Sequence, residues 1–143
     1  MTGAMSLQSL EKIGRKIALL TVIAYPTLGF NNIQPAAAQP RDNYGAIAYS
    51  RQTRANGTSW NFATRDAAER AAVRECERYS GSGDCQSMIW FRNACAALAE
   101  ADNGALGWAW NRDRGPAERE AVRQCFRYRG DNCKVIRWTC TDR

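Results

Sequence analysis

Apolar residues recur with helical spacing in one stretch of the chain, and this stretch occurs twice. Four residues of 68–79 fall on one stripe of a helix with 3.6 residues per turn: Ala68, Ala72, Cys76 and Tyr79. The stretch 117–128 repeats the pattern, with nine of its twelve aligned positions identical. Because the stripe consists mostly of small residues, we expect each helix to lie close against a sheet. Thr64 and Asp113 precede the two helices as candidate N-caps.

Short apolar and alternating runs surround each predicted helix. The run 44–50 is apolar on both faces, which is typical of a central strand. One further strand is predicted before the first helix and one after it, and the second half of the chain repeats this order. In the second half the first two strands are joined by an Asp102-Asn103-Gly104 turn, whose Asn-Gly pair favours a hairpin. The predicted strands are 44–50, 58–62, 87–91, 96–99, 105–110 and 135–138.

This order predicts an α+β fold in which two tandem β-β-α-β repeats, at about 43–92 and 94–141, form one small domain with about six strands and two helices. Before it, Lys12 and nearby basic residues precede an apolar run, 17–30, and the Ala36-Ala37-Ala38 signature of signal peptidase. We therefore expect residues 1–38 to be a cleaved secretory signal peptide and residues 39–143 to be the mature domain. After cleavage we expect no membrane span, and a periplasmic or extracellular location.

The six cysteines all lie in the mature part, and an even number behind an export signal indicates disulfides. Cys76 and Cys125 end the two helices, and a cysteine precedes each following strand. This repeat favours Cys76–Cys85 and Cys125–Cys133, which leaves Cys95–Cys140 to join two strand ends. In the first repeat, Tyr44 and Arg92 stand at the positions that Cys95 and Cys140 occupy in the second. The first unit therefore lacks the disulfide between strand ends, and we expect it to open more easily. No metal site is expected, because neither Cys-x2-Cys spacing nor histidine occurs.

The ordered motifs resemble the domain of unknown function 4189 family, which comprises small exported bacterial proteins. The resemblance is carried by Tyr44-Gly-Ala-Ile-Ala-Tyr49, by Cys95-Ala-Ala-Leu-Ala99 and by Gly107-Trp-Ala-Trp110, together with the helix that ends in Cys76. It covers about residues 43–141 and supports the fold, export and disulfides. The family has no established catalytic residues, so the resemblance implies none here.

Candidate chemistry is sparse. Without histidine, Ser-His-Asp and Cys-His nucleophile systems are excluded. A carboxylate pair such as Glu100 and Asp102 remains for acid/base work, but such a pair needs a cleft and a raised pKa on one member. We expect no cofactor, and the solvated turn is the simpler interpretation of these acids.

Tryptophan and arginine offer a binding surface instead. Trp108 and Trp110 share one face of a strand by alternation, and a helix on the other face would leave them partly exposed. Trp90 and Trp138 occupy matching places in the third strands and are expected in the core. Arginine rows on the helices, with Arg74 and Arg123 as representatives, either form a solvated face or bind an anionic partner.

The leading hypothesis is an exported, non-catalytic module that binds a protein or cell-envelope component, with Trp108, Trp110, Asp102, Asn103, Arg74 and Arg123 as candidate contacts. One alternative is a small carboxylate-dependent hydrolase of an envelope or host polymer. Another is an exported enzyme inhibitor that presents the Asp102-Asn103-Gly104 turn. Nucleic acid is not an expected partner, because the charge is modest and its signs are interspersed.

Overall fold

The computed structural model describes residues 41–143, and the predicted signal peptide lies outside them. The predicted element order is confirmed: the fold is α+β, built from two similar β-β-α-β units. The first unit contains β1 (Tyr44–Tyr49), β2 (Asn56–Phe62), α1 (Arg65–Ser80) and β3 (Gln86–Arg92). The second contains β4 (Cys95–Glu100), β5 (Leu106–Asn111), α2 (Arg114–Arg127) and β6 (Lys134–Cys140).

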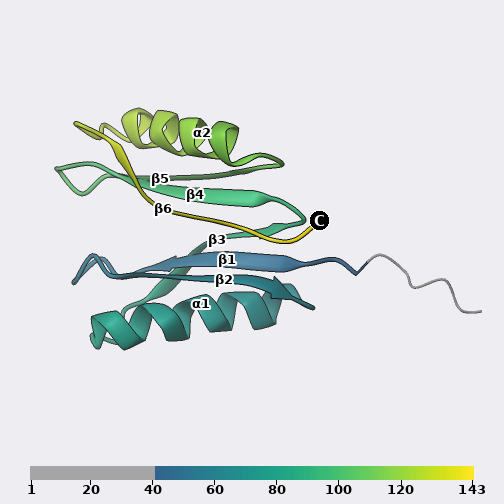
Figure 1. The fold of residues 1–143 in the computed structure, drawn as a ribbon. Coiled ribbons are helices and arrows are strands. Elements are labelled where there is room, and N and C mark those ends of the chain that lie inside the picture. The colour runs from purple at the N-terminus through teal and green to yellow at the C-terminus, as the bar shows by residue number, and fades with distance from the viewer. Residues whose placement is uncertain (1–40) are drawn as a thin grey trace, which may run out of the picture. The chain divides into compact units, whose positions relative to one another are not determined.

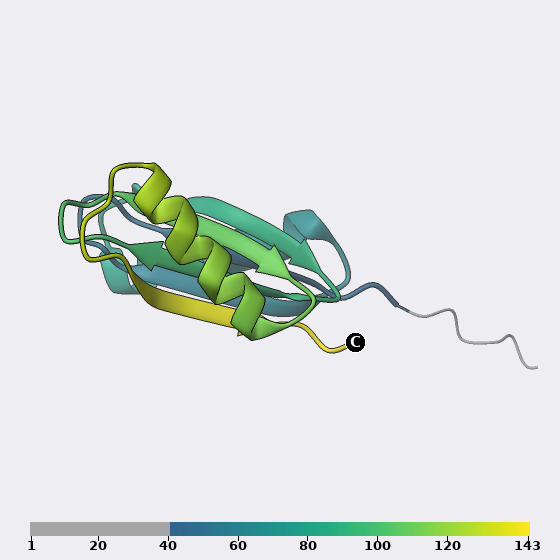
Figure 2. The same ribbon diagram turned by 90° about the horizontal axis from the view of Figure 1, so that it is seen from above.

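Each unit forms a three-stranded antiparallel sheet, with the order β2-β1-β3 in one and β5-β4-β6 in the other. The two sheets pack face to face, and each helix covers the outer face of its own sheet (Figure 1; Figure 2 from above). The central strands are therefore buried on both sides, as their continuous apolar sequence predicts. Ile47 and Leu98 lie between the sheets, whereas Ala46 and Ala97 face the helices.

Glycines in the strands allow each helix to approach its sheet closely. A Cβ on Gly57 would lie 2.3 Å from the Ala72 carbonyl oxygen, and one on Gly107 would lie 2.1 Å from that of Ala121. Helix and strand backbones therefore nearly touch at these two points. The buried helix positions opposite the strands are correspondingly small: Ala68, Ala72 and Cys76 in α1, and Ala117, Ala121 and Cys125 in α2.

All three predicted disulfides are confirmed. Cys76–Cys85 and Cys125–Cys133 each tie the last part of a helix to the start of the following strand. Cys95–Cys140 joins the ends of β4 and β6, which are antiparallel as the pairing requires. Each bond contributes about 2–4 kcal/mol, mainly by restricting the unfolded chain.

Several aromatic residues lie further out than the sequence pattern predicts. Tyr79 and Tyr128 are exposed, because the buried stripe of each helix ends at its cysteine. Tyr79 follows on the final turn of α1, and Tyr128 is the C-cap residue of α2. Trp90 and Trp138 are not core residues: they are 38% and 41% exposed.

Trp90 and Trp138 have the same surroundings in the two units. Each packs under an arginine from the start of the neighbouring helix: the Arg65 guanidinium lies 4.7 Å from the centre of the Trp90 ring, and that of Arg114 lies 3.5 Å from the Trp138 ring. Each third strand is at the edge of its sheet, so its outward tryptophan is only partly covered, by the arginine and, for Trp90, also by the Tyr44 ring, whose centre lies 6.2 Å away.

The helix caps differ between the units. The Thr64 hydroxyl accepts a hydrogen bond from the Ala67 N–H at 3.2 Å, as predicted. Asp113 occupies the N-cap position of α2 but makes no side-chain cap. Its carboxylate binds the Arg143 guanidinium at 2.8 Å instead, so it anchors the end of the chain.

Replacing Gly107 by alanine tests the close approach of helix and sheet. The new methyl group would collide with the α2 backbone, which cannot move without shifting the whole helix, so we expect the free energy of unfolding to fall by about 2–3 kcal/mol. Chemical denaturation measures this change. Gly115→Ala is the control, because a Cβ there meets only the flexible tip of Arg119 at 3.3 Å. Equal stability of the two variants would contradict the prediction.

The unequal strand ends generate a second prediction. Tyr44 and Arg92 are register partners in the first unit, at the places that Cys95 and Cys140 occupy in the second. Without a covalent link, we expect backbone amides of 44–48 to exchange with solvent faster than those of 95–99, measured by native-state hydrogen exchange. Cys95→Ser combined with Cys140→Ser should remove the difference. Faster exchange at 95–99 in the unaltered protein would refute the idea.

Candidate functional site

The two sheets meet along two seams that are related by the similarity of the units. At one seam the edge strands β3 and β5 face each other, and at the other β2 faces β6. Strand pairing identifies the equivalent residues of the two units, because Ile47 and Leu98 occupy matching positions in the central strands. Ile47 pairs with Thr58 of β2 and Ile89 of β3. Leu98 pairs with Trp108 of β5 and Arg137 of β6, so Thr58 is equivalent to Trp108 and Ile89 to Arg137. These partners face the space between the sheets, as Ile47 and Leu98 do.

The seams differ in chemistry. The β3/β5 seam, which we call the open seam, presents apolar residues between the sheets: Ile89, Phe91, Leu106 and Trp108. The equivalent positions of the β2/β6 seam, which we call the polar seam, are Arg137, Thr139, Asn56 and Thr58. Ile136 beside them also packs on the layer between the sheets. The same fold therefore builds one mostly polar and one apolar junction.

Hydrogen bonds close the polar seam. The Arg137 Nε donates to the Asn56 Oδ1 at 2.5 Å. At the other end of the seam, the Asn61 amide donates to the Asp142 carboxylate at 2.6 Å and its oxygen accepts the Asp142 N–H at 2.8 Å. These three hydrogen bonds join the two edges of the junction near both of its ends.

The open seam instead contains a groove of about 660 Å³. Trp108 is half-buried against the apolar layer between the sheets, and its backbone N–H donates to the Gln124 Oε1 at 2.7 Å. The Trp108 ring also stacks on Tyr128, with 6.3 Å between ring centres. Trp110 is 61% exposed at the mouth. The groove is lined by Met88, Ile89, Trp90, Phe91, Arg92, Trp108, Ala109, Trp110, Glu120 and Gln124.

The structure brings only two of the six predicted contact residues together in this groove, Trp108 and Trp110. Asp102 and Asn103 lie on the exposed β4–β5 turn. Arg74 lines a different groove between β2 and α1, and Arg123 on α2 forms an ion pair of 2.8 Å with Glu120. The predicted residues are thus divided among the open seam, one turn and two helix faces.

Sequence reasoning missed the β3 side of the groove and the two α2 residues. The sequence pattern places Ile89 and Phe91 on the third predicted strand and Glu120 and Gln124 on the second predicted helix, without indicating that they line a groove. A position-by-position comparison of the two repeats is the signal that finds them, since the apolar Ile89 and Phe91 stand where the second unit has Arg137 and Thr139.

The predicted turn is held firmly although it is exposed. The Asn103 N–H donates to the Asp131 carboxylate at 2.8 Å, and the Asn103 amide donates to the Arg129 carbonyl at the same distance. The Asn132 amide binds the Asp102 carboxylate, also at 2.8 Å. The connection between α2 and β6 therefore fixes the conformation of the β4–β5 turn.

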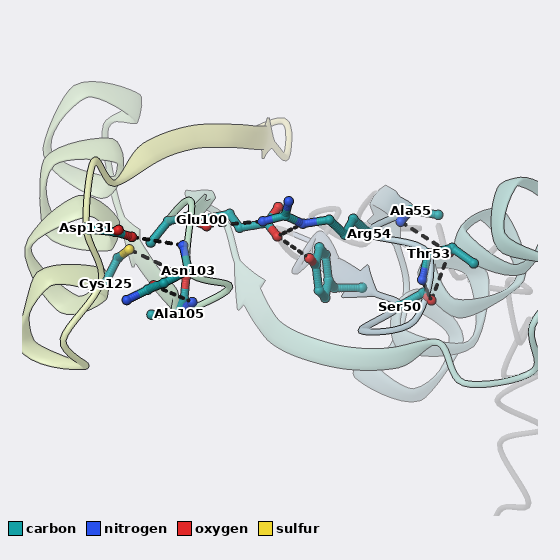
Figure 3. A network of polar contacts seen from close by, with 11 residues as sticks. Ser50, Thr53, Arg54, Ala55, Glu100, Asn103, Ala105, Cys125 and Asp131 are labelled. Carbon is teal, nitrogen blue, oxygen red and sulfur yellow. Dashed lines mark hydrogen bonds and ion pairs between the residues drawn. The ribbon is translucent and has the colours of Figure 1, made fainter.

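The two carboxylates considered for catalysis have separate surroundings. Asp102 is exposed, whereas Glu100 is buried and faces the opposite sheet. The Tyr49 hydroxyl donates to the Glu100 Oε1 at 2.6 Å, and the Arg54 guanidinium forms an ion pair with the same carboxylate. Figure 3 shows Arg54 pointing at Glu100. Glu100 thus serves to join β1, the β1–β2 turn and β4.

A second polar cluster fixes the β1–β2 turn to the end of α1. The Ser50 hydroxyl donates to the Asp84 carboxylate at 2.5 Å, and the Gln52 N–H donates to it at 3.0 Å. Hydrogen bonds from Ser50 and Ser82 lower the pKa of Asp84 to about 2. The carboxylate therefore stays ionised and holds the turn at any ordinary pH.

Neither a candidate metal site nor a membrane-spanning helix occurs within residues 41–143. Groups of three or more cysteine, aspartate and glutamate side chains arranged to hold a metal ion do not occur among these residues. In the same part of the chain, every helix is too short or too polar to cross a membrane.

Comparison with known proteins agrees with the motifs. The family model described as Domain of unknown function (DUF4189) matches residues 44–140. The chain belongs to this family. The match spans both units of the fold, from the start of β1 to the end of β6.

Several mycobacterial proteins are similar to this chain. Protein Rv1269c of Mycobacterium tuberculosis is 43% identical over 70 residues, which cover 49% of this chain and 52% of that protein. Protein Mb1300c of Mycobacterium bovis matches with the same values. The chain thus spans about half the length of these curated relatives. The NMR structure of Rv1813c from Mycobacterium tuberculosis has a TM-score of 0.51 at 23% identity, covering 94% of this chain and 98% of that one, which shows a shared fold.

The buried phenol of Tyr49 makes a testable difference to stability at alkaline pH. Burial and the hydrogen bond to Glu100 raise the pKa of Tyr49 from 10.0 to about 12. The folded protein therefore keeps a proton that the unfolded chain loses, so the free energy of unfolding is unaffected by this group below pH 10 and decreases as pH rises toward 12.

Tyr49→Phe should flatten this alkaline decrease and cost about 1 kcal/mol at neutral pH through the lost hydrogen bond. Urea unfolding across the alkaline range measures both effects. Tyr79→Phe is the matched control, since it removes a phenol that is 68% exposed. A Tyr49→Phe variant that keeps the alkaline slope of the unaltered protein would contradict the assignment.

Proposed function

We propose that this protein is an exported, non-catalytic binding module that contacts a protein or cell-envelope component through the open seam. The observation that carries the proposal is the difference between the seams. Both occupy equivalent places in the fold, yet one is closed by hydrogen bonds and the other keeps an apolar groove beside an exposed tryptophan. An exposed apolar surface costs solubility, so a retained one favours a role in recognition.

The groove has the composition of a recognition site. Tryptophan and arginine are the side chains that most often dominate binding energy, when a partner removes them from water. Trp110 offers a large, mostly exposed ring, and Trp108 forms the apolar floor beside it. Arg92, Glu120 and Gln124 supply polar groups at the edges that can orient a partner.

Export is part of the proposal. The predicted signal peptide motivates it, and three disulfides with no free cysteine among the described residues suit an oxidising compartment, either the periplasm or the extracellular space.

The firmly held turn favours a second candidate function, an enzyme inhibitor. Inhibitory loops bind tightly when their bound conformation already exists in the free protein, since little conformational entropy is then lost. The Asp102-Asn103-Gly104 turn is exposed and fixed by hydrogen bonds from two sides. In this case Asn103, not Trp110, would be essential for binding.

Affinity capture with a matched pair of variants tests the proposal. The disulfide-bonded protein is immobilised and exposed to envelope and extracellular extract at physiological salt. Trp110→Ala should weaken binding of the captured component by about 2 kcal/mol, roughly thirtyfold, because the ring would be buried in the complex. Titration of the captured component against each variant measures this change.

Phe126→Ala is the control, because Phe126 is similarly exposed, at 52%, and lines neither the open seam nor the groove between β2 and α1. Equal affinities of the Trp110→Ala and Phe126→Ala variants would contradict the open seam as the binding site. A captured enzyme that loses activity, with binding dependent on Asn103 and independent of Trp110, would favour the inhibitor. Turnover of an envelope or host polymer that is lost in Glu100→Gln would favour the hydrolase.

A further inference from the structure

One acidic residue of α2 has no counterpart in α1, and this changes the charge of the exposed face of α1. In α2, Glu120 forms ion pairs with both Arg123, at 2.8 Å, and Arg127. The equivalent position of α1 is Ala71, within a stretch that is otherwise nearly identical. The acid that neutralises two arginines on α2 is therefore missing from α1.

The corresponding arginines of α1 are Arg74 and Arg78. Both are exposed, and neither takes part in an ion pair within residues 41–143, although seven other arginines there do. They lie four residues apart, so both project from the same side of the helix. This face presents two neighbouring, uncompensated guanidinium groups.

The nearest acidic residues of α1 are directed to the backbone. The Glu75 carboxylate accepts the Thr58 N–H at 3.2 Å, which attaches the helix to β2. The Glu77 carboxylate accepts the N–H groups of Gly83 at 2.9 Å and Cys85 at 2.7 Å. These bonds hold both carboxylates in structural positions, where they accept from backbone donors and not from Arg74 or Arg78.

The two arginines border a groove of about 990 Å³ between α1 and β2. Its apolar part includes Trp60 and Phe62 from the strand and Val73 from the helix. Trp60 is 54% exposed. Glu75 and Glu77 also line the groove, but their carboxylates are held by backbone N–H groups, so the two guanidinium groups are the charges left to pair with an occupant. Charge complementarity therefore favours an occupant that carries acidic groups beside an apolar side chain.

We propose that the groove between α1 and β2 is a second binding site, which accepts an acidic segment of a partner polypeptide. Carboxylates of the segment pair with Arg74 and Arg78, and an adjacent apolar side chain packs on Trp60. Guanidinium groups bind carboxylates through two parallel hydrogen bonds, which adds orientation to the charge attraction. A nucleic acid fits less well, because a polyphosphate is bound through many phosphate contacts and this face offers two arginines without an acidic partner.

This site is independent of the open seam. It uses α1 and β2, whereas the open seam uses β3, β5 and α2, and the two helices cover opposite faces of the stacked sheets (Figure 1). Loss of one site should therefore leave the other intact, so failure of this inference and failure of the proposed function can be distinguished.

The test exchanges the residue that distinguishes the helices. The probe is a short fluorescent peptide of alternating glutamate and leucine, and fluorescence anisotropy at low and physiological salt measures its affinity. Ala71→Glu should restore the arrangement seen in α2, neutralise Arg74 and Arg78, and weaken binding about tenfold, as expected for the loss of one charge-assisted pair. Ala71→Gln has nearly the same size without the charge and should bind as the unaltered protein does.

The reciprocal change provides a gain of binding. Glu120→Ala releases Arg123 and Arg127 and should increase the amount of peptide bound. Circular dichroism and thermal unfolding confirm that each variant is folded. Trp110→Ala should leave peptide affinity unchanged.

Two results would overturn the proposal. The first is Ala71→Glu binding the peptide as tightly as Ala71→Gln, since the missing acid would then not explain the site. The second is tighter binding of a single-stranded oligonucleotide or of phosphatidylglycerol vesicles than of the peptide, which would assign the arginines to a phosphate ligand.

Discussion

Burial of the two central strands on both faces is the constraint on which the rest of the structure depends. β1 and β4 each contact a helix on one side and the opposite sheet on the other. A single β-β-α-β unit would leave the inner face of its sheet in water, so the two units stabilise one another through the layer around Ile47 and Leu98. The helices must lie close to keep this small core dry, which explains the alanines on the helices and the glycines in β2 and β5.

The near-equivalence of the units makes their differences informative. Where packing alone decides, equivalent positions hold similar residues, such as Gly57 and Gly107 or the disulfides that follow each helix. The differences gather where the units need not match: at the seams, in the strand-end disulfide and on the outer faces of the helices. Both proposed binding sites come from such differences, since an apolar junction replaces a polar one at the open seam and Ala71 replaces an acid on α1.

Buried polar groups join the two sheets at the ends of their central strands. Tyr49 and Glu100 occupy equivalent positions at the ends of β1 and β4, and they bind each other across the junction. With Arg54 on the same carboxylate, every member of this small network has a partner, which is the condition for burying such groups at little cost. The carboxylate considered for catalysis is thereby committed to a structural contact.

The sequence by itself determined the element order, the disulfide pairing and the central place of β1, because these follow from local periodicity and from cysteines at repeated offsets. It also placed Trp108 and Trp110 on one face of β5. Only the tertiary structure decided which edge strands meet, and hence that β3 contributes Ile89 and Phe91 to a groove with Trp108. It also decided that Trp90 and Trp138 lie outside the core, since alternation gives a side chain's face but not whether another layer covers it. Contacts between the sheets and several of the ion pairs involve side chains from segments that are distant in the sequence. A local sequence pattern cannot predict such contacts.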